Sequence, residues 1–143
     1  MYDERSGYSD DYEHMDLYRA NVNRSIKGKR GQAFLKQLLE VLEAMPEKAL
    51  IKEAVFDGKR YCPLGAIWKH KGLSKHIFKE SFQDYKDEWG EIFGKGLNIA
   101  KCLANEIIFI NDAGCFRSET PDVRWRRMHK WVMDNIIREE SVV

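Results

Sequence analysis

The strongest constraint on the fold is one amphipathic stretch, residues 32–45, which ends at a proline. Apolar side chains recur every three or four residues from Phe34 to Met45, and charged or amide side chains fill the opposite positions. This spacing predicts an α-helix that buries one face. Because Pro46 cannot continue a helix, we expect the helix to end just before it.

Two further stretches carry helix signals of different kinds. Residues 63–71 begin with Pro63, whose fixed φ and missing N–H suit the first position of a helix, and Cys62 precedes it at the capping position. Residues 96–111 carry a nearly continuous apolar face. Such a face predicts a helix at the centre of the protein.

The remaining signals predict the other elements. Thr120-Pro121 opens a last helix as its cap and first residue. Aromatic side chains at helical spacing within residues 73–94 indicate one helix or two short ones. Residues 54–61 contain Asp-Gly between short apolar runs, which fits a short β-hairpin or an irregular loop. The sequence therefore predicts a mainly α protein, a compact bundle of about five helices.

Composition limits the class of protein. The chain has 143 residues, 33% of them charged, and a formal net charge of +1. No stretch approaches the roughly 20 apolar residues that cross a bilayer, and residues 1–11 are acidic and polar, unlike a signal peptide. Three cysteines without a close pair fit reduced thiols. We expect a soluble cytoplasmic protein with no membrane partner.

Charge divides the N-terminal third of the chain. Residues 1–18 carry six acidic side chains, one arginine and four tyrosines, which predicts an acidic tyrosine-rich arm, or tyrosines that dock on a partner or on the protein itself. We assign residues 19–143 to a single helical domain. Residues 19–36 hold six cations and no acid, so they pair with the arm, form a solvated face or steer a charged partner.

Two charged surfaces are predicted to bind a protein partner. The arm could imitate the charge of a nucleic acid, and a cationic stripe expected on the outer side of the last helix could engage an acidic patch. These residues are Tyr8, Asp10, Asp11, Tyr12 and Glu13 of the arm, and Arg124, Arg126, Arg127 and Lys130 of the stripe.

A nucleic-acid partner is the alternative. Gly28-Lys29-Arg30-Gly31 resembles the loop with which KH domains clamp a single strand, and Lys27, Lys29 and Arg30 would then contact phosphates. The strand expected before that loop is not evident in the sequence, and a plain turn before a helix explains the two glycines as well.

Covalent chemistry has one candidate. A helix start lowers the pKa of a thiol, so Cys62 could be the nucleophile of a hydrolase with His70, His76 or His129 as its base. No glycine-rich oxyanion loop accompanies it, and the cysteines and histidines match no zinc-binding spacing. We predict no enzymatic activity, no cofactor and no metal site.

Short ordered motifs give the chain a family resemblance. Arg30–Leu35 (RGQAFL), Cys62–Ala66 (CPLGA), Asn111-Asp112, and Glu119-Thr120-Pro121 with Arg124-Trp125 resemble a family of small phage, prophage and plasmid proteins without an established activity. The resemblance covers roughly residues 30–137 and implies a mobile-element origin and a mostly helical single domain. The hypothesis is a protein that binds and inhibits a host factor, such as a component of CRISPR or another antiphage defence. The alternative is a small nucleic-acid-binding regulator that uses residues 27–30 and 124–130, and the oligomeric state is left open.

Overall fold

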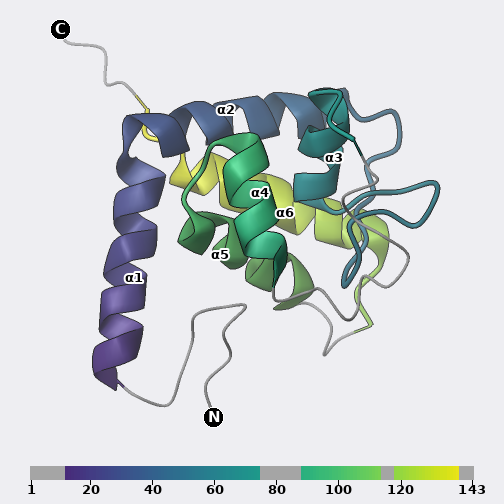
Figure 1. The fold of residues 1–143 in the computed structure, drawn as a ribbon. Coiled ribbons are helices and arrows are strands. Elements are labelled where there is room, and N and C mark those ends of the chain that lie inside the picture. Colours follow the sequence, from purple (N-terminus) through teal and green to yellow (C-terminus); the bar gives the residue numbers. More distant parts are fainter. Residues whose placement is uncertain (1–11, 75–87, 114–117, 139–143) are drawn as a thin grey trace, which may run out of the picture.

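The structure, a computed structural model, describes residues 12–74, 88–113 and 118–138. Within these ranges the chain forms six α-helices and no β-strand, which confirms the mainly α prediction with one helix more than expected. The helices are α1 (Tyr12–Lys27), α2 (Lys29–Ala44), α3 (Pro63–His70), α4 (Trp89–Leu97), α5 (Lys101–Asp112) and α6 (Pro121–Asn135). In Figure 1, α1 runs down one side and α2 crosses the top, and the remaining helices fill the angle between them.

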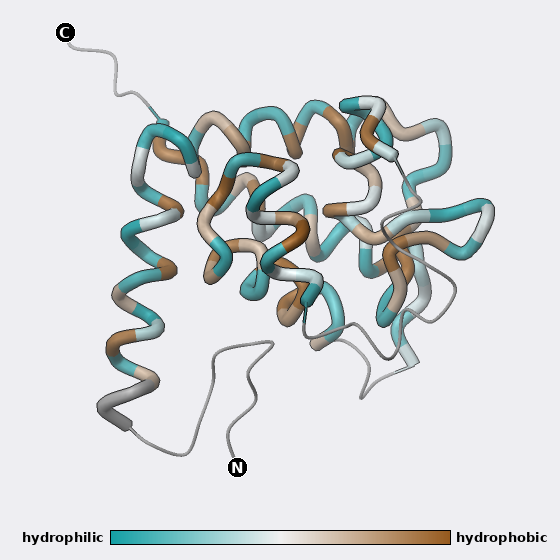
Figure 2. Tube along the Cα trace, viewed as in Figure 1, coloured by the Kyte–Doolittle hydropathy of each residue, from teal (hydrophilic) through white to brown (hydrophobic). Residues whose placement is uncertain are grey.

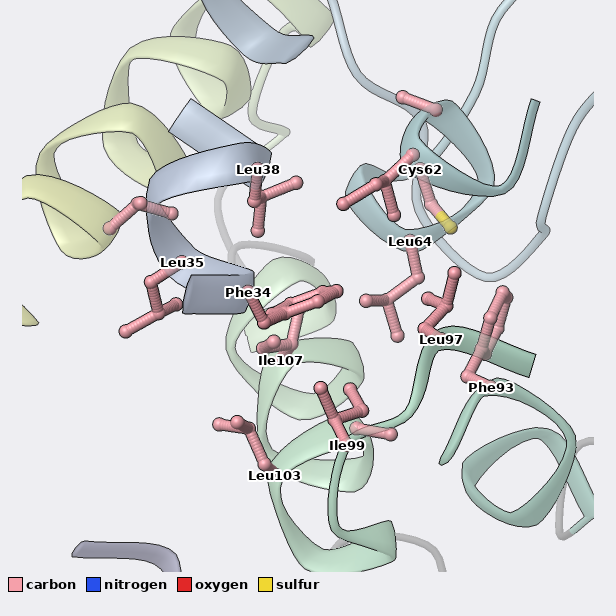
Figure 3. Close-up of a cluster of buried hydrophobic side chains, with 14 of the residues drawn as sticks. Phe34, Leu35, Leu38, Cys62, Leu64, Phe93, Leu97, Ile99, Leu103 and Ile107 are labelled. Atoms are coloured by element: carbon pink, nitrogen blue, oxygen red, sulfur yellow. The ribbon is translucent and has the colours of Figure 1, made fainter. Parts of the chain in front are cut away.

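The core is built mainly from α2, α3, α4 and α5. Apolar side chains of α2 meet those of the other three helices, and Cys62 lies beside them (Figure 3). Figure 2 shows hydrophobic residues alternating with hydrophilic ones along α1 and α2, as expected for helices with one buried side. The fully buried members include Leu35, Leu38, Leu64, Phe93, Leu103 and Ile107.

The sequence does not predict α1. Its buried side is one row of side chains spaced four residues apart, namely Tyr18, Val22 and Ile26. A row one side chain wide gives a weak amphipathic signal. The helix begins at Tyr12, inside the residues assigned to the acidic arm, so Tyr12 and Glu13 belong to its first turn.

Two side chains of α1 dock on α5. Arg19 Nη1 donates to Glu106 Oε2 at 2.6 Å, and the Tyr18 hydroxyl donates to the backbone oxygen of Cys102 at 3.4 Å. Tyr18 therefore packs on the protein itself, which is one of the two roles considered for the tyrosines. Tyr8, Asp10 and Asp11 lie outside the described residues.

The corner between α1 and α2 is held by Gln32. Its Nε2 donates to the backbone oxygens of Ile26, at 2.7 Å, and Asn135, at 3.0 Å. Its Oε1 accepts from the backbone nitrogen of Ile137 at 2.8 Å. One amide thus joins the end of α1, the start of α2, the last residue of α6 and the chain just beyond it.

Helix boundaries follow the sequence where a proline marks them. α2 ends at Ala44, before Pro46, and α3 and α6 begin at Pro63 and Pro121. The helix predicted over residues 96–111 is interrupted, because Asn98 adopts a left-handed conformation with φ of 57° that ends α4. Residues 75–87, with most of the predicted aromatic stripe, lie outside the described part, and α4 contains the rest of that stripe.

The segment between α2 and α3 has no regular structure but is pinned by motif residues. Asn111 Nδ2 donates to the backbone oxygen of Ile51 at 2.8 Å, and Asp112 Oδ1 accepts from the backbone nitrogen of Glu53 at 3.1 Å. A Cβ on Gly65 would overlap the backbone of Val55, so only glycine lets α3 approach so closely. Asn111, Asp112 and Gly65, which belong to the quoted motifs, therefore have structural roles in positioning this segment.

The predicted hairpin is reduced to one antiparallel bridge between Phe56 and Tyr61. Asp57 Oδ1 accepts from the backbone nitrogens of Lys59, at 3.1 Å, and Arg60, at 2.7 Å, which shapes the turn. These backbone donors, Arg60 first, lower the pKa of Asp57. None of the described helices is long and apolar enough to cross a membrane.

Candidate functional site

Cys62 caps the start of α3 and is buried. Its Sγ accepts from the backbone nitrogen of Gly65 at 3.3 Å, as a side-chain cap does. Burial raises the pKa of the thiol to about 12, so the proton stays on at neutral pH. Of the three histidines considered as its base, His70 is exposed, His129 stacks on Trp125 and lies 3.1 Å from Glu43, and His76 lies outside the described residues.

Arg124 does not lie on the outer side of α6, and that prediction is wrong. Its side chain is 3% exposed, and its Nε lies 3.2 Å from Glu119 Oε1, although no hydrogen bond forms at that nitrogen. Its two terminal nitrogens donate to the backbone oxygens of Leu50, at 3.0 Å, and Glu119, at 3.3 Å. Arg124 therefore ties the α2–α3 segment to α6.

Arg127 is also committed to internal contacts. Its Nε and Nη2 donate to the two carboxylate oxygens of Glu119 at 2.7 and 3.0 Å. The same guanidinium donates to the backbone oxygens of Ile110 and Asn111 at the end of α5. The hydrogen bonds from Arg127, supported by the charge of Arg124, lower the pKa of Glu119. This cluster fastens α5 to α6.

Only two members of the predicted stripe are exposed. Arg126 pairs with Asp122 at 3.5 Å, and Lys130 pairs with Asp134 at 2.6 Å, both one helical turn apart. Their side chains are 68% and 77% exposed. Each cation of the stripe therefore has a carboxylate within reach, and the outer face of α6 is close to electrically neutral.

A groove of about 590 Å³ opens between the end of α2, the segment that follows it, and α3. We call it the α2–α3 groove. Its apolar wall comes from Val41, Ala44, Met45, Ala49, Tyr61 and Ala66. Grooves of this size commonly hold a small molecule or the side chains of a bound segment.

The rim of the α2–α3 groove is cationic. Lys59, Arg60 and Lys69 line it together with one carboxylate, Glu47. Arg60 donates to both oxygens of Glu47, at 2.9 and 3.1 Å, and this hydrogen bonding lowers the pKa of Glu47. Lys69 Nζ lies 5.0 Å from the centre of the Tyr61 ring. The groove thus offers an apolar wall beside an excess of positive charge.

A second hollow, of about 200 Å³, lies where α1 and α2 meet, beside the start of α5. Arg24, Lys29 and Arg30 line it, and no acidic residue is among its lining within the described part of the chain. Lys27 stands exposed between Arg24 and Lys29 in the sequence. We call these four cations and their hollow the α1–α2 corner.

The two glycines of the KH-like stretch have separate explanations. A Cβ on Gly31 would overlap the backbone oxygen of Ser25, so this glycine is required where α1 and α2 touch. A Cβ on Gly28 would lie 3.4 Å from the backbone oxygen of Arg24, which leaves room for it. Gly31 is therefore a packing residue, whereas the cations between the glycines are exposed.

Comparisons with known proteins give no functional assignment for this chain. No family model, no curated protein and no solved structure matches this chain. Among the described residues, no group of three or more histidine, cysteine, aspartate or glutamate side chains could hold a metal ion. Cys115 lies outside those residues.

Sequence reasoning missed the α2–α3 groove because its residues come from separate stretches. Lys59 and Arg60 follow the turn at Gly58, whereas Lys69 lies on α3. The Asp-Gly turn is the sequence signal that could have predicted this proximity. It reverses the chain so that Phe56 pairs with Tyr61, and the residues after the turn therefore lie close to the start of α3.

Proposed function

We propose that this chain is a non-enzymatic protein of a phage or another mobile element that acts in the cytoplasm of the host cell by binding a host protein. The ordered motifs that resemble small phage, prophage and plasmid proteins support this origin. Inhibition of a component of CRISPR or another antiphage defence is the role that such an origin favours.

The α2–α3 groove is the observation that carries the proposal. It joins an apolar wall to the exposed cations Lys59 and Lys69, and interfaces combine such an apolar centre with a polar rim. Its shape is held by the Glu47–Arg60 pair and by the bridge at Tyr61, so the groove is formed before a partner arrives. Preformed surfaces lose less entropy on binding.

The chemistry of the groove defines its partner. An apolar side chain of the partner would fill the space against Met45 and Ala66, and carboxylates beside it would meet Lys59 and Lys69. The partner is therefore a protein segment with an apolar anchor flanked by acidic residues. The acidic arm stays a predicted contact outside the groove. Arg126 and Lys130 are also predicted contacts, but each pairs with an aspartate, so we expect them to contribute little, and the α6 variant below tests this.

Affinity capture with paired variants tests the proposal. The tagged chain is incubated with a lysate of the host bacterium, and the stoichiometry of each captured protein is measured for the wild type and two variants. The groove variant is Lys59→Glu/Lys69→Glu, and the matched control is Arg126→Glu/Lys130→Glu, which changes the net charge equally on α6. Circular dichroism checks that both variants fold.

A partner held one to one by the wild type and the α6 variant, but lost with the groove variant, is the expected result. Purified partner should then lose its activity when the wild type is added and keep it with the groove variant. Loss with the α6 variant alone would place the partner elsewhere and overturn the assignment to the groove. Absence of any stoichiometric partner would overturn the function.

A further inference from the structure

We infer that the α1–α2 corner binds the phosphodiester backbone of a nucleic acid, which is a second binding activity beyond the proposed protein partner. Arg24, Lys29 and Arg30 surround one hollow, and Lys27 adds a fourth exposed cation. Phosphate contacts by arginine and lysine supply most of the affinity of proteins that bind nucleic acid without reading its sequence.

The partners of the two arginines are the observation that carries this inference. Arg24 Nη1 donates to Asn21 Oδ1 at 3.2 Å, and Arg30 Nη1 donates to Asn98 Oδ1 at 3.4 Å. Side-chain amides orient a guanidinium without cancelling its charge. Both arginines are thus positioned at the hollow and keep nitrogens available for an anion.

The surroundings favour phosphate over an acidic protein or a lipid surface. None of the large apolar side chains that are exposed in the described part of the chain lines the hollow. Protein interfaces use apolar or aromatic anchors at their centre, and membrane binding also buries apolar surface. A hollow whose charged lining residues are all cations fits a polyanion.

The position of the corner keeps it separate from the groove. α2 has 16 residues, so its two ends are about 24 Å apart, with the corner at its start and the α2–α3 groove at its end. A nucleic acid at the corner and a protein at the groove could therefore be held at the same time. The starts of α2 and α5, which have no acidic residue in the first turn, place partial positive charge there, and this offsets the partial negative charge at the end of α1.

Fluorescence anisotropy with labelled oligonucleotides tests the inference on the full chain. The probes are a 20-nucleotide single strand of mixed sequence and the corresponding duplex, titrated over a series of NaCl concentrations. Four phosphate contacts predict a slope of log affinity against log salt of about −3 for the single strand. The two probes distinguish which form of nucleic acid is preferred.

The corner variant is Lys29→Gln/Arg30→Gln, and its matched control is Lys59→Gln/Lys69→Gln, which removes two positive charges at the groove. The corner variant should bind about tenfold more weakly at moderate salt and should flatten the salt slope by about 1.4, since two contacts are lost. The control should bind as the wild type does. Since all four positions are exposed, thermal unfolding should be unchanged in both variants.

Four results would overturn the inference. These are no binding of either probe, binding that does not depend on salt, equal weakening by the corner and control variants, and tighter corner-dependent binding to phosphatidylglycerol vesicles than to oligonucleotide. The last would assign the site to a lipid surface. None of these results bears on protein capture through the groove, because that test rests on different residues.

Discussion

Two clusters of basic residues look alike in the sequence and differ in the folded protein. On α6, Arg124 and Arg127 share Glu119, and the exposed cations each pair with an aspartate one turn away. At the α1–α2 corner the arginines are held by asparagines instead. The number of cations therefore says little about the charge that a partner would meet. What decides it is whether carboxylates or neutral amides lie beside them.

The difference also separates structural from available arginines. Arg124 donates to the backbone oxygens of Leu50 and Glu119, and the bond to Leu50 is buried, so losing it leaves a buried acceptor without a donor. Arg30 makes one long hydrogen bond in an exposed place. Removing the first should harm the fold, and removing the second should leave it intact.

The sharpest test of the comparison is Arg124→Ala. It leaves the oxygen of Leu50 without its donor and takes one of two cations from buried Glu119. Because Arg127 still holds Glu119, we expect a loss of about 3 kcal/mol in the free energy of unfolding, at the lower end for a broken buried pair. Urea denaturation measures it. Arg126→Ala is the control and should change the value by less than about 1 kcal/mol; equal effects would end the distinction between the two residues.

Gly31→Ala tests the packing role within the corner. The new Cβ would overlap the backbone oxygen of Ser25, so α1 and α2 must move apart, at a cost of about 2 kcal/mol in unfolding free energy. Gly28→Ala meets no such obstacle and should cost less than about 1 kcal/mol. Thermal and urea unfolding of the pair give the answer, and similar losses in both variants would contradict the assignment of Gly31 to packing.

The dependence of stability on pH reports on the α6 cluster. Hydrogen bonds from Arg127 lower the pKa of Glu119 below its ordinary value of 4.5 in the folded state. A carboxylate whose pKa is depressed by folding stabilises the protein above its unfolded pKa, and this contribution is lost as pH falls through the folded value. Stability should therefore fall as pH drops below about 4.5.

The Glu119→Gln variant tests whether ionisation of Glu119 causes this dependence of stability on pH. The variant should be less stable than the wild type at neutral pH, and the gap should narrow as the solution becomes acidic, because protonated Glu119 resembles glutamine. Unfolding midpoints of the wild type and the variant, measured from about pH 3 to pH 7, give the difference in stability at each pH. A gap that stays constant over this range would show that ionisation of Glu119 does not stabilise the fold.

The smallest effect is expected from neutral substitutions at the corner. Lys29→Gln/Arg30→Gln removes exposed cations that pair with no carboxylate in the described part of the chain. We expect a change in unfolding free energy within about 0.5 kcal/mol, towards higher stability at low salt because repulsion is relieved. Denaturation at two salt concentrations measures it. A large loss would show that the corner is structural, as α6 is.

Much of the fold was predictable because prolines and wide apolar faces mark it. Pro46, Pro63 and Pro121 bound the helices where expected, and the buried face of α2 follows its spacing. α1 was missed because Tyr18, Val22 and Ile26 form a row too narrow to stand out among charged residues. The break before α5 depends on the conformation of a single residue, Asn98, for which the apolar pattern carries no signal.

The candidate surfaces were predictable only in part. The lack of acidic residues near the corner is visible in the sequence, and so are the aspartates four residues from Arg126 and Lys130. The burial of Arg124 is not, because its partner oxygen belongs to Leu50, 74 residues away. Likewise, the groove joins residues from both sides of a turn. Contacts between distant segments decide which charges remain on the surface.

The hydrogen bonds of Gln32 also imply that the protein completes its fold late during synthesis. Its partner Asn135 lies 103 residues further along the chain, so the contact cannot form until α6 has left the ribosome. Closing such a distant contact is slow compared with forming α1 or α2 alone. A nascent chain halted before α6 would carry the cations of the corner on two helices joined by the bond from Gln32 to Ile26 but lacking the two bonds from Gln32 to residues 135 and 137.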